Sequence, residues 1–266
     1  MRVKLLALLS AIVLCVLGAV PASASLEGHT YLALGDSVAF GYNPLLVKGG
    51  FAGDQSLFVG YPEIAAGTLG MNDVNASCPG ETTGGFISLT NGADYLCLPY
   101  RAIRQRYEAA RRLDFAIAYL STHHDVRLIT IDLGANDAFK AACTTVACIG
   151  AVLAGIEANL RFIFGQIRNV AHYHHDLVTL TYYSLKYDAA DAAATQGLNA
   201  PIIAATQAFG GKVASGFDAF KAPALAAGGS SCAAGLLIVL APGVCDVHPT
   251  PLGRDLLAKA VVDAVA

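Results

Sequence analysis

The sequence contains no tryptophan, and only 14% of its residues are charged. The charges are 17 basic and 20 acidic side chains without a basic cluster, which argues against nucleic acid as a partner. The lack of tryptophan counts mildly against sugar binding, because sugar rings are commonly held on aromatic side chains. No Gly-x-Ser-x-Gly motif occurs, so an α/β-hydrolase of the nucleophile-elbow type is disfavoured.

Long apolar runs are also scarce, and the clearest one is at the N-terminus. Arg2 and Lys4 precede the apolar run Leu5–Val20, and an Ala-Ser-Ala pattern of small residues follows. This pattern predicts a signal peptide over residues 1–24; a retained membrane anchor is the alternative. Elsewhere we expect no apolar run long enough to span a bilayer, and therefore no stable membrane insertion after cleavage.

Residues 25–266 show no repeat, low-complexity linker or break in composition. We expect them to form a single domain that is secreted and acts as a monomer. Cys15 lies in the leader, so residues 25–266 contain six cysteines. An even number is common in disulfide-bonded exported proteins. Fifteen pairings of six cysteines are possible. We favour sequential pairing because each bond then closes a local loop, with Cys78 paired to Cys97, Cys143 to Cys148, and Cys232 to Cys245. A metal cluster is the rival interpretation, but no C-x-x-C is present.

Apolar strand patterns alternate with helical patterns along the chain. Strands are predicted at Tyr31–Leu34, Asn72–Ala76, Val126–Leu133 and Leu177–Tyr183, with a weaker fifth at Lys212–Gly216. Helices are predicted at Pro62–Leu69, Tyr107–Ser121, Ile149–Ala171, Asn199–Phe209 and Pro251–Val265. The alternation predicts an α/β fold, with a parallel sheet of about five strands covered by helices on both faces. Two segments, Gly41–Gly60 and Lys221–Gly243, are expected to be long loops.

A serine follows the first predicted strand directly, in the tripeptide Gly35-Asp36-Ser37. An alcohol needs a general base within hydrogen-bond reach to act as a nucleophile at neutral pH. His248 is the best candidate base, because Pro249 and a predicted helix follow it and we expect it on a rigid turn. The structural alternatives are a helix cap for Ser37 and a solvent-exposed histidine at a helix start for His248. Together the two residues predict a serine hydrolase.

Two turn-like segments between them carry possible oxyanion donors. Pro-Gly-Glu at 79–81 offers the backbone N–H of Gly80, and Gly-Ala-Asn-Asp at 134–137 offers the side-chain amide of Asn136. Each segment taken alone is ordinary turn chemistry. The carboxylates of Asp36 and Asp137 are expected to hold their turns by accepting backbone N–H bonds.

These segments together resemble the SGNH hydrolase family, also called GDS(L) lipases and esterases. Gly35-Asp36-Ser37-Val38 is similar to the first block, with valine in place of the usual leucine, and Gly134-Ala135-Asn136-Asp137 is similar to the third. Gly80 resembles the glycine of the second block, and His248-Pro249 with Gly253 resembles the fifth. The resemblance covers nearly all of the chain after the leader, and the secreted actinobacterial-type members that it resembles also have six paired cysteines.

The resemblance implies a flavodoxin-like three-layer α/β/α sandwich and ester hydrolysis through an acyl-serine, with no metal or cofactor. It implies that the oxyanion donors are the Ser37 N–H, the Gly80 N–H and the Asn136 amide. The chain departs from the family's Asp-x-x-His, because Cys245 stands three residues before His248 and Asp246 only two. Either Asp246 orients the imidazole from an altered turn, or a backbone carbonyl near Cys245 does so.

The substrate class stays open at this stage. The leading hypothesis is a secreted esterase or lipase acting on a small-molecule or lipid ester, with a carbohydrate acetyl esterase or a phospholipase or acyltransferase as alternatives. Apolar residues after the nucleophile either line an acyl pocket or pack in the core: Leu45, Leu46, Phe51 and Phe58. A metal-dependent hydrolase would instead use Asp36, Asn136, Asp137 and His248, and a catalytically inactive binding module is a further alternative. A second set of possible metal ligands is His172, His174, His175 and Asp176, but this group is expected to be a solvated helix end.

Overall fold

A computed structural model of the chain describes residues 26–51, 53–88 and 111–266. The predicted signal peptide, residues 1–24, therefore lies outside the described residues, as does Cys97. The start of the helix predicted from Tyr107 lies outside them too.

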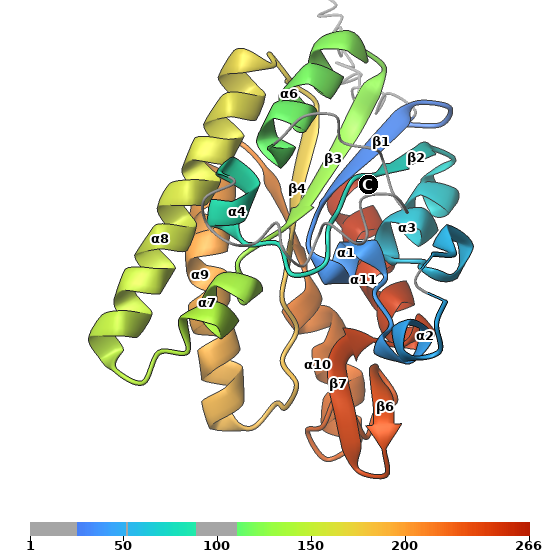
Figure 1. Ribbon diagram of the computed structural model, residues 1–266, viewed down its shortest axis with the longest axis vertical. Helices are drawn as coiled ribbons and strands as arrows, with labels where there is room; N and C mark the ends of the chain where they lie inside the picture. The colour runs from blue at the N-terminus through green and yellow to red at the C-terminus, as the bar shows by residue number, and fades with distance from the viewer. Residues whose placement is uncertain (1–25, 52, 89–110) are drawn as a thin grey trace, which may run out of the picture.

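The main sheet is parallel throughout, and its strands correspond to the five predicted ones (Figure 1). They are β1 (Thr30–Gly35), β2 (Asn72–Asn75), β3 (Val126–Asp132), β4 (Asp176–Thr181) and β5 (Lys212–Ser215), in the spatial order β2-β1-β3-β4-β5. Every residue of β1 is buried, because helices cover the sheet on both faces. The order of the strands reverses between β1 and β3, and the carboxyl ends beside such a switch point are where α/β folds bind ligands.

Helices cover both faces of the sheet (Figure 1). Each face has its own apolar core. One face carries α4 (Thr83–Ile87), α6 (Arg112–Thr122), α8 (Val146–Gly165), the π-helical η4 (Gln166–Val170) and α9 (Ala189–Ala208). The other carries α1 (Ser37–Phe40), α3 (Tyr61–Leu69), α10 (Gly216–Ala226) and α11 (Pro251–Val265). The short α7 (Ala135–Ala141) follows β3. The predicted three-layer α/β/α fold is confirmed.

Helix α9 begins ten residues earlier than its predicted start at Asn199. Asp188 caps it by accepting hydrogen bonds from the backbone N–H groups of Ala190 and Asp191, at 3.1 and 2.9 Å. An alanine-rich run follows that cap, and Pro201 is accommodated inside the helix. The early start matters for function, because the added turns of α9 lie beside the cavity described below.

The expected long loop over Lys221–Gly243 is wrong. Its first part completes α10, and its last part forms β6 (Leu237–Ala241), which pairs with β7 (Val244–Pro249) in an antiparallel hairpin separate from the main sheet. A Pro-Gly pair forms the hairpin turn, and Gly243 has a φ of +74° that favours glycine. The other expected loop, Gly41–Gly60, contains two short helices, α2 (Pro44–Lys48) and η1 (Gln55–Leu57).

Two of the predicted disulfides are confirmed. Cys143 is bonded to Cys148, with Cα atoms 5.5 Å apart, and Cys232 is bonded to Cys245, with Cα atoms 5.8 Å apart. The second bond ties β7 to the segment that precedes β6. The pairing of Cys78 with Cys97 stays a prediction, because Cys97 lies outside the described residues.

The expectation about apolar runs needs one correction. The helical segment Val146–Val170 is long and apolar enough, by length and composition alone, to cross a membrane. Several of its side chains pack in the core of the sheet face that α8 covers: Ile156, Leu160, Ile163, Phe164 and Ile167. A core helix of a soluble domain passes the same test of length and composition.

Candidate active site

The turn after β1 presents Ser37 at the carboxyl end of the sheet. Gly35 has a φ of +152°, and a Cβ there would lie 1.6 Å from Asp132 Oδ1, so only glycine fits. Asp36 caps α1 through a 2.8 Å bond from the Val38 N–H to its Oδ1. The cap is therefore Asp36 and not Ser37, whose half-buried hydroxyl lines a cavity.

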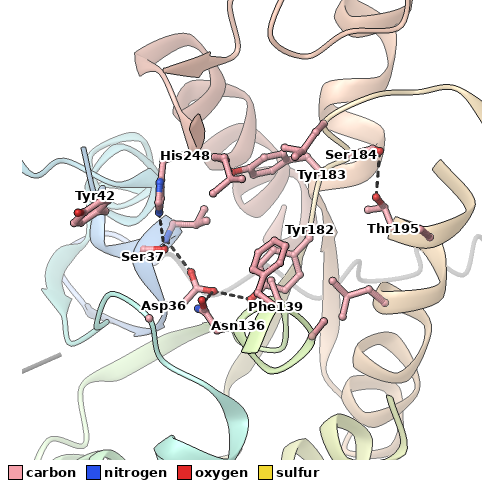
Figure 2. A pocket seen from close by; sticks show the side chains of 18 of the residues that line it. Asp36, Ser37, Tyr42, Asn136, Phe139, Tyr182, Tyr183, Ser184, Thr195 and His248 are labelled. Carbon is pink, nitrogen blue, oxygen red and sulfur yellow. Dashed lines mark hydrogen bonds between the residues drawn. The ribbon is translucent and has the colours of Figure 1, made fainter. Parts of the chain in front are cut away.

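His248 meets Ser37 from the opposite end of the chain. Its Nε2 lies 2.8 Å from Ser37 Oγ, as Figure 2 shows. The Nδ1 atom on the other side of the ring contacts Asp246 Oδ1, which also accepts a 3.0 Å bond from the His248 N–H. These bonds lower the pKa of the Asp246 carboxyl, which therefore stays ionised at neutral pH. The expected turn is wrong: His248 is the penultimate residue of β7.

Two tyrosines that the sequence interpretation missed hold this part of β7. The ring of Tyr42 lies 4.8 Å from the imidazole of His248, at an interplanar angle of 51°. The hydroxyl of Tyr183 donates a 2.5 Å bond to the carbonyl of Val247, and its ring stacks on Phe220. No local motif marks either tyrosine, because each acts through a partner far away in the chain.

Gly80 and Asn136 line the same cavity as Ser37 and His248. Gly80 has a φ of +77°, and its carbonyl accepts a 3.0 Å bond from Lys140 Nζ. The Asn136 amide nitrogen donates to the carbonyl of Glu81 at 3.0 Å and to Asp36 Oδ2 at 3.2 Å. Gly80 thus lies in a turn, whereas Asn136 is the second residue of α7 and not part of the predicted turn, and hydrogen bonds join the two segments.

Two buried carboxyls accept hydrogen bonds from α1, just after β1. Burial raises the pKa of Asp36 to about 6, and bonds from the Val38 N–H and from the Tyr182 hydroxyl, at 2.9 Å, partly offset that rise. Burial, and then the nearby Asp36, raise the pKa of Asp132 well above its usual range. Asp132 Oδ2 accepts a 3.1 Å bond from the Ala39 N–H. Tyr182 has its hydroxyl on Asp36 and lines the cavity (Figure 2).

The structural role expected of Asp36 and Asp137 is confirmed. The Asp137 carboxylate accepts bonds from the backbone N–H and the hydroxyl of Thr83, at 2.9 and 2.6 Å. Asp137 thereby ties α7 to the start of α4. The described residues contain no group of three or more His, Cys, Asp and Glu side chains that could hold a metal ion, so neither set of proposed ligands converges. In the second set, Asp176 pairs with Lys212 at 3.1 Å instead.

The cavity has a volume of about 540 Å3 and an apolar wall. That wall comes from α7, from the segment after β4, from α9 and from β7: Ala135, Ala138, Phe139, Tyr182, Tyr183, Leu185, Ala194, Leu198 and Val247. Phe139, Tyr182 and Tyr183 face the cavity in Figure 2. The four apolar residues that follow Ser37 in the sequence and were considered for an acyl pocket do not line this cavity: Leu45, Leu46, Phe51 and Phe58. Phe58 packs with Phe40 and Leu46 in a small core, whereas Leu45 and Phe51 are exposed.

Comparisons with solved structures agree on the fold. An acetylxylan esterase from Geobacillus stearothermophilus has a TM-score of 0.57 and 16% identity, over 90% of this chain and 95% of that one. Phospholipase A1 from Streptomyces albidoflavus NA297 has a TM-score of 0.55 and 17% identity, over 90% of this chain and all of that one. No curated protein matches the sequence. The sequence model of the GDSL-like lipase/acylhydrolase family matches residues 33–256, from β1 into α11, and the chain belongs to that family.

Proposed function

We propose that this family member is a serine carboxylester hydrolase in which Ser37 is the nucleophile and His248 the general base. The observation that carries the proposal is the 2.8 Å approach of His248 Nε2 to Ser37 Oγ. Contact of Nδ1 with the ionised Asp246 supports a role for that carboxylate in orienting the ring and in stabilising the imidazolium as it forms.

The reaction has two halves. Ser37 Oγ attacks the ester carbonyl carbon while His248 Nε2 takes the hydroxyl proton, which gives a tetrahedral intermediate. That intermediate collapses with cleavage of the bond to the alcohol oxygen, which receives the proton from His248, and an acyl-serine remains. Water then attacks the acyl carbon with His248 again as base, and the carboxylic acid leaves as Ser37 recovers its proton.

The developing oxyanion needs donors at fixed positions. We assign this role to the backbone N–H groups of Ser37 and Gly80 and to the amide of Asn136. The longer of the two Asn136 bonds, to Asp36, is the one that a substrate oxygen would replace. Such a donor is worth about 3 kcal/mol of barrier.

The cavity favours an acyl chain longer than acetyl. Its volume of about 540 Å3 lies within the range of ordinary ligand clefts, and an acetyl group would fill only a small part of it. Its apolar wall also stabilises hydrocarbon that leaves water. An esterase for acetylated carbohydrate is the second candidate, because one of the structural neighbours is an acetylxylan esterase.

The setting of the enzyme belongs to the proposal too. The leader over residues 1–24 and the two disulfides support secretion of residues 25–266 as one domain into an oxidising compartment. We expect a monomer without stable membrane insertion, which gel filtration and vesicle flotation of the processed chain would test.

A fluorophosphonate probe and a series of p-nitrophenyl esters test the catalytic proposal. We expect the probe to label Ser37, and Ser37→Ala to abolish labelling. Hydrolysis should rise with acyl length from the acetyl ester and then level off. A sharp preference for acetyl would favour the carbohydrate candidate, and a probe that labels no serine would contradict the proposal.

A further inference from the structure

A buried ion pair involves Glu81, the residue that follows the candidate oxyanion donor Gly80. Glu81 Oε2 contacts Arg112 Nε, and the two side chains are 0% and 1% exposed. Burial lowers the pKa of the Arg112 guanidinium to about 10, which leaves it charged at neutral pH. Replacing such a pair by apolar residues is often neutral or even stabilising, because both charges lose their hydration. Stability alone therefore gives a poor account of this pair.

Glu81 is connected to two of the three candidate donors, Gly80 and Asn136. It follows Gly80 directly in the chain, so a displacement of Glu81 also moves the Gly80 backbone. The carbonyl of Glu81 accepts the 3.0 Å bond from the Asn136 amide, and its N–H donates to the carbonyl of Cys78 at 3.2 Å. Cys78 donates in turn to the carbonyl of Gly35, at 2.9 Å. Moving Glu81 would therefore displace both donors relative to the nucleophile.

The other end of the pair is anchored in the core. Arg112 is the first residue of α6, and that helix buries Leu113, Ala116 and Leu120 against the sheet. A side chain at the start of a packed helix offers a fixed point from which to hold a turn. On the solvent side, Lys140 holds the carbonyl of Gly80.

We propose that the Arg112–Glu81 ion pair positions the Gly80 N–H and the Asn136 amide for the oxyanion. Both are positioning residues, because neither touches the reacting atoms. The inference rests on the proposed ester hydrolase function. Its consequence is that the pair affects binding of the transition state more than binding of the ester, because the donors are needed most when negative charge develops.

The test compares Arg112→Met and the double variant Glu81→Gln with Arg112→Met. For each, kcat and KM are measured on one p-nitrophenyl ester, and the inhibition constant is measured for an alkylboronic acid, which forms a tetrahedral adduct with the serine. Titration with the fluorophosphonate normalises the rates to active protein. Arg161→Met is the matched control, because it breaks an exposed ion pair on α8, in which Arg161 Nη2 lies 2.8 Å from Glu157 Oε1.

We expect Arg112→Met to lower kcat roughly ten- to a hundredfold and to raise the boronate inhibition constant by the same factor, with KM within about twofold. The double variant, which leaves no charge unpaired, should regain thermal stability but keep both defects. Arg161→Met should match the wild type. If Arg112→Met does not fold, the double variant alone decides the question.

The proposal is overturned if normalised kcat and the boronate constant stay within about twofold of wild type in the foldable variants, or if the double variant regains both stability and kcat. These outcomes differ from failure of the proposed function. In that case the wild-type enzyme would neither hydrolyse the esters nor react with the fluorophosphonate.

Discussion

The candidate nucleophile and its candidate base come from two regions that are built differently. Ser37 follows β1, a strand whose residues are all buried and which pairs with β2 on one side and β3 on the other. His248 lies in β7, half of a two-stranded hairpin outside the main sheet, in which Val244 is 53% exposed. The first region is held by the core; the second depends on individual ties.

Those ties are a disulfide, a tyrosine hydroxyl and the start of a helix. Cys245 is bonded to Cys232, Tyr183 donates to Val247, and Thr250 donates its backbone N–H to Leu236 at 2.9 Å. A hairpin alone is only marginally stable in water, so these contacts must supply what a sheet would otherwise provide. The comparison indicates that changes in the hairpin should affect the base without unfolding the sheet.

The largest expected effect comes from removing either partner of the central contact. Ser37→Ala and His248→Ala should each lower kcat by about 10^4-fold or more, and the double variant should lose little beyond either single one, because the two groups act as a unit. Steady-state kinetics on a p-nitrophenyl ester would measure this. Losses that multiply in the double variant would show that the two side chains act independently.

A smaller effect is expected at the support of the base. Asp246→Asn removes the charge that faces His248 Nδ1, and we expect kcat to fall about 10^3-fold with little change in KM. Asp263→Asn, which weakens an exposed ion pair with Lys259 on α11, is the control. An Asp246→Asn variant that keeps more than about a third of wild-type kcat would return the orienting role to a backbone carbonyl.

Removing the hairpin disulfide should change stability and activity together. Loss of the Cys232–Cys245 bond, with both residues changed to alanine, should cost about 3 kcal/mol of unfolding free energy in the chain-entropy account and lower kcat severalfold. Loss of the shorter Cys143–Cys148 loop should cost about 2 kcal/mol and leave kcat unchanged. Urea unfolding and ester hydrolysis would measure both. Equal kcat values in the two variants would contradict a special role for the hairpin bond.

The carboxyl groups of the two regions should also contribute to folding stability with opposite dependence on pH. The folded pKa values of Asp36, which is about 6, and of Asp132 lie above the ordinary 3.8, so the contribution of each group to stability is present below 3.8 and is lost as pH rises through its folded pKa. The pKa of Asp246 is lowered, so its contribution is present above 3.8 and is lost in acid.

Asp132→Asn tests this difference, because the amide imitates the protonated acid. Its Tm should exceed that of the wild type at pH 8 and match it at pH 4. Asp246→Asn should instead lower Tm at pH 7 and leave it unchanged at pH 3. Thermal unfolding followed by circular dichroism would measure both. Equal pH dependence in wild type and Asp132→Asn would show that Asp132 is not held in its neutral form.

The parallel sheet could be predicted because its strands carry their own signal. The central parts of β3 and β4, residues 128–131 and 177–181, are runs of β-branched and aliphatic residues, as strands buried on both faces require. The hairpin was missed although the sequence contains a usable pattern. Leu236–Leu240 is an unbroken apolar run, and Pro242-Gly243 separates it from a second short run, which is a hairpin signal.

The site was predictable to the extent that its residues lie in short motifs. Ser37, Gly80, Asn136 and His248 each stand in such a motif, and the structure brings all of them to one cavity. The wall of that cavity could not be predicted, because Phe139, Leu185 and Leu198 come from three separate segments. Their common feature is position relative to the sheet, which only the folded chain defines.

Gly253 does not line the cavity, yet its backbone position constrains the segment that carries His248. It sits in α11 where a Cβ would come within 2.5 Å of the carbonyl of Leu236 and 3.0 Å of Phe220 and Pro249. Any side chain there would force the helix away from the base of the hairpin that carries His248. A random screen for inactive variants should therefore recover substitutions at Gly253 as well as at Ser37. Such a screen alone would not distinguish this steric requirement at Gly253 from a catalytic role.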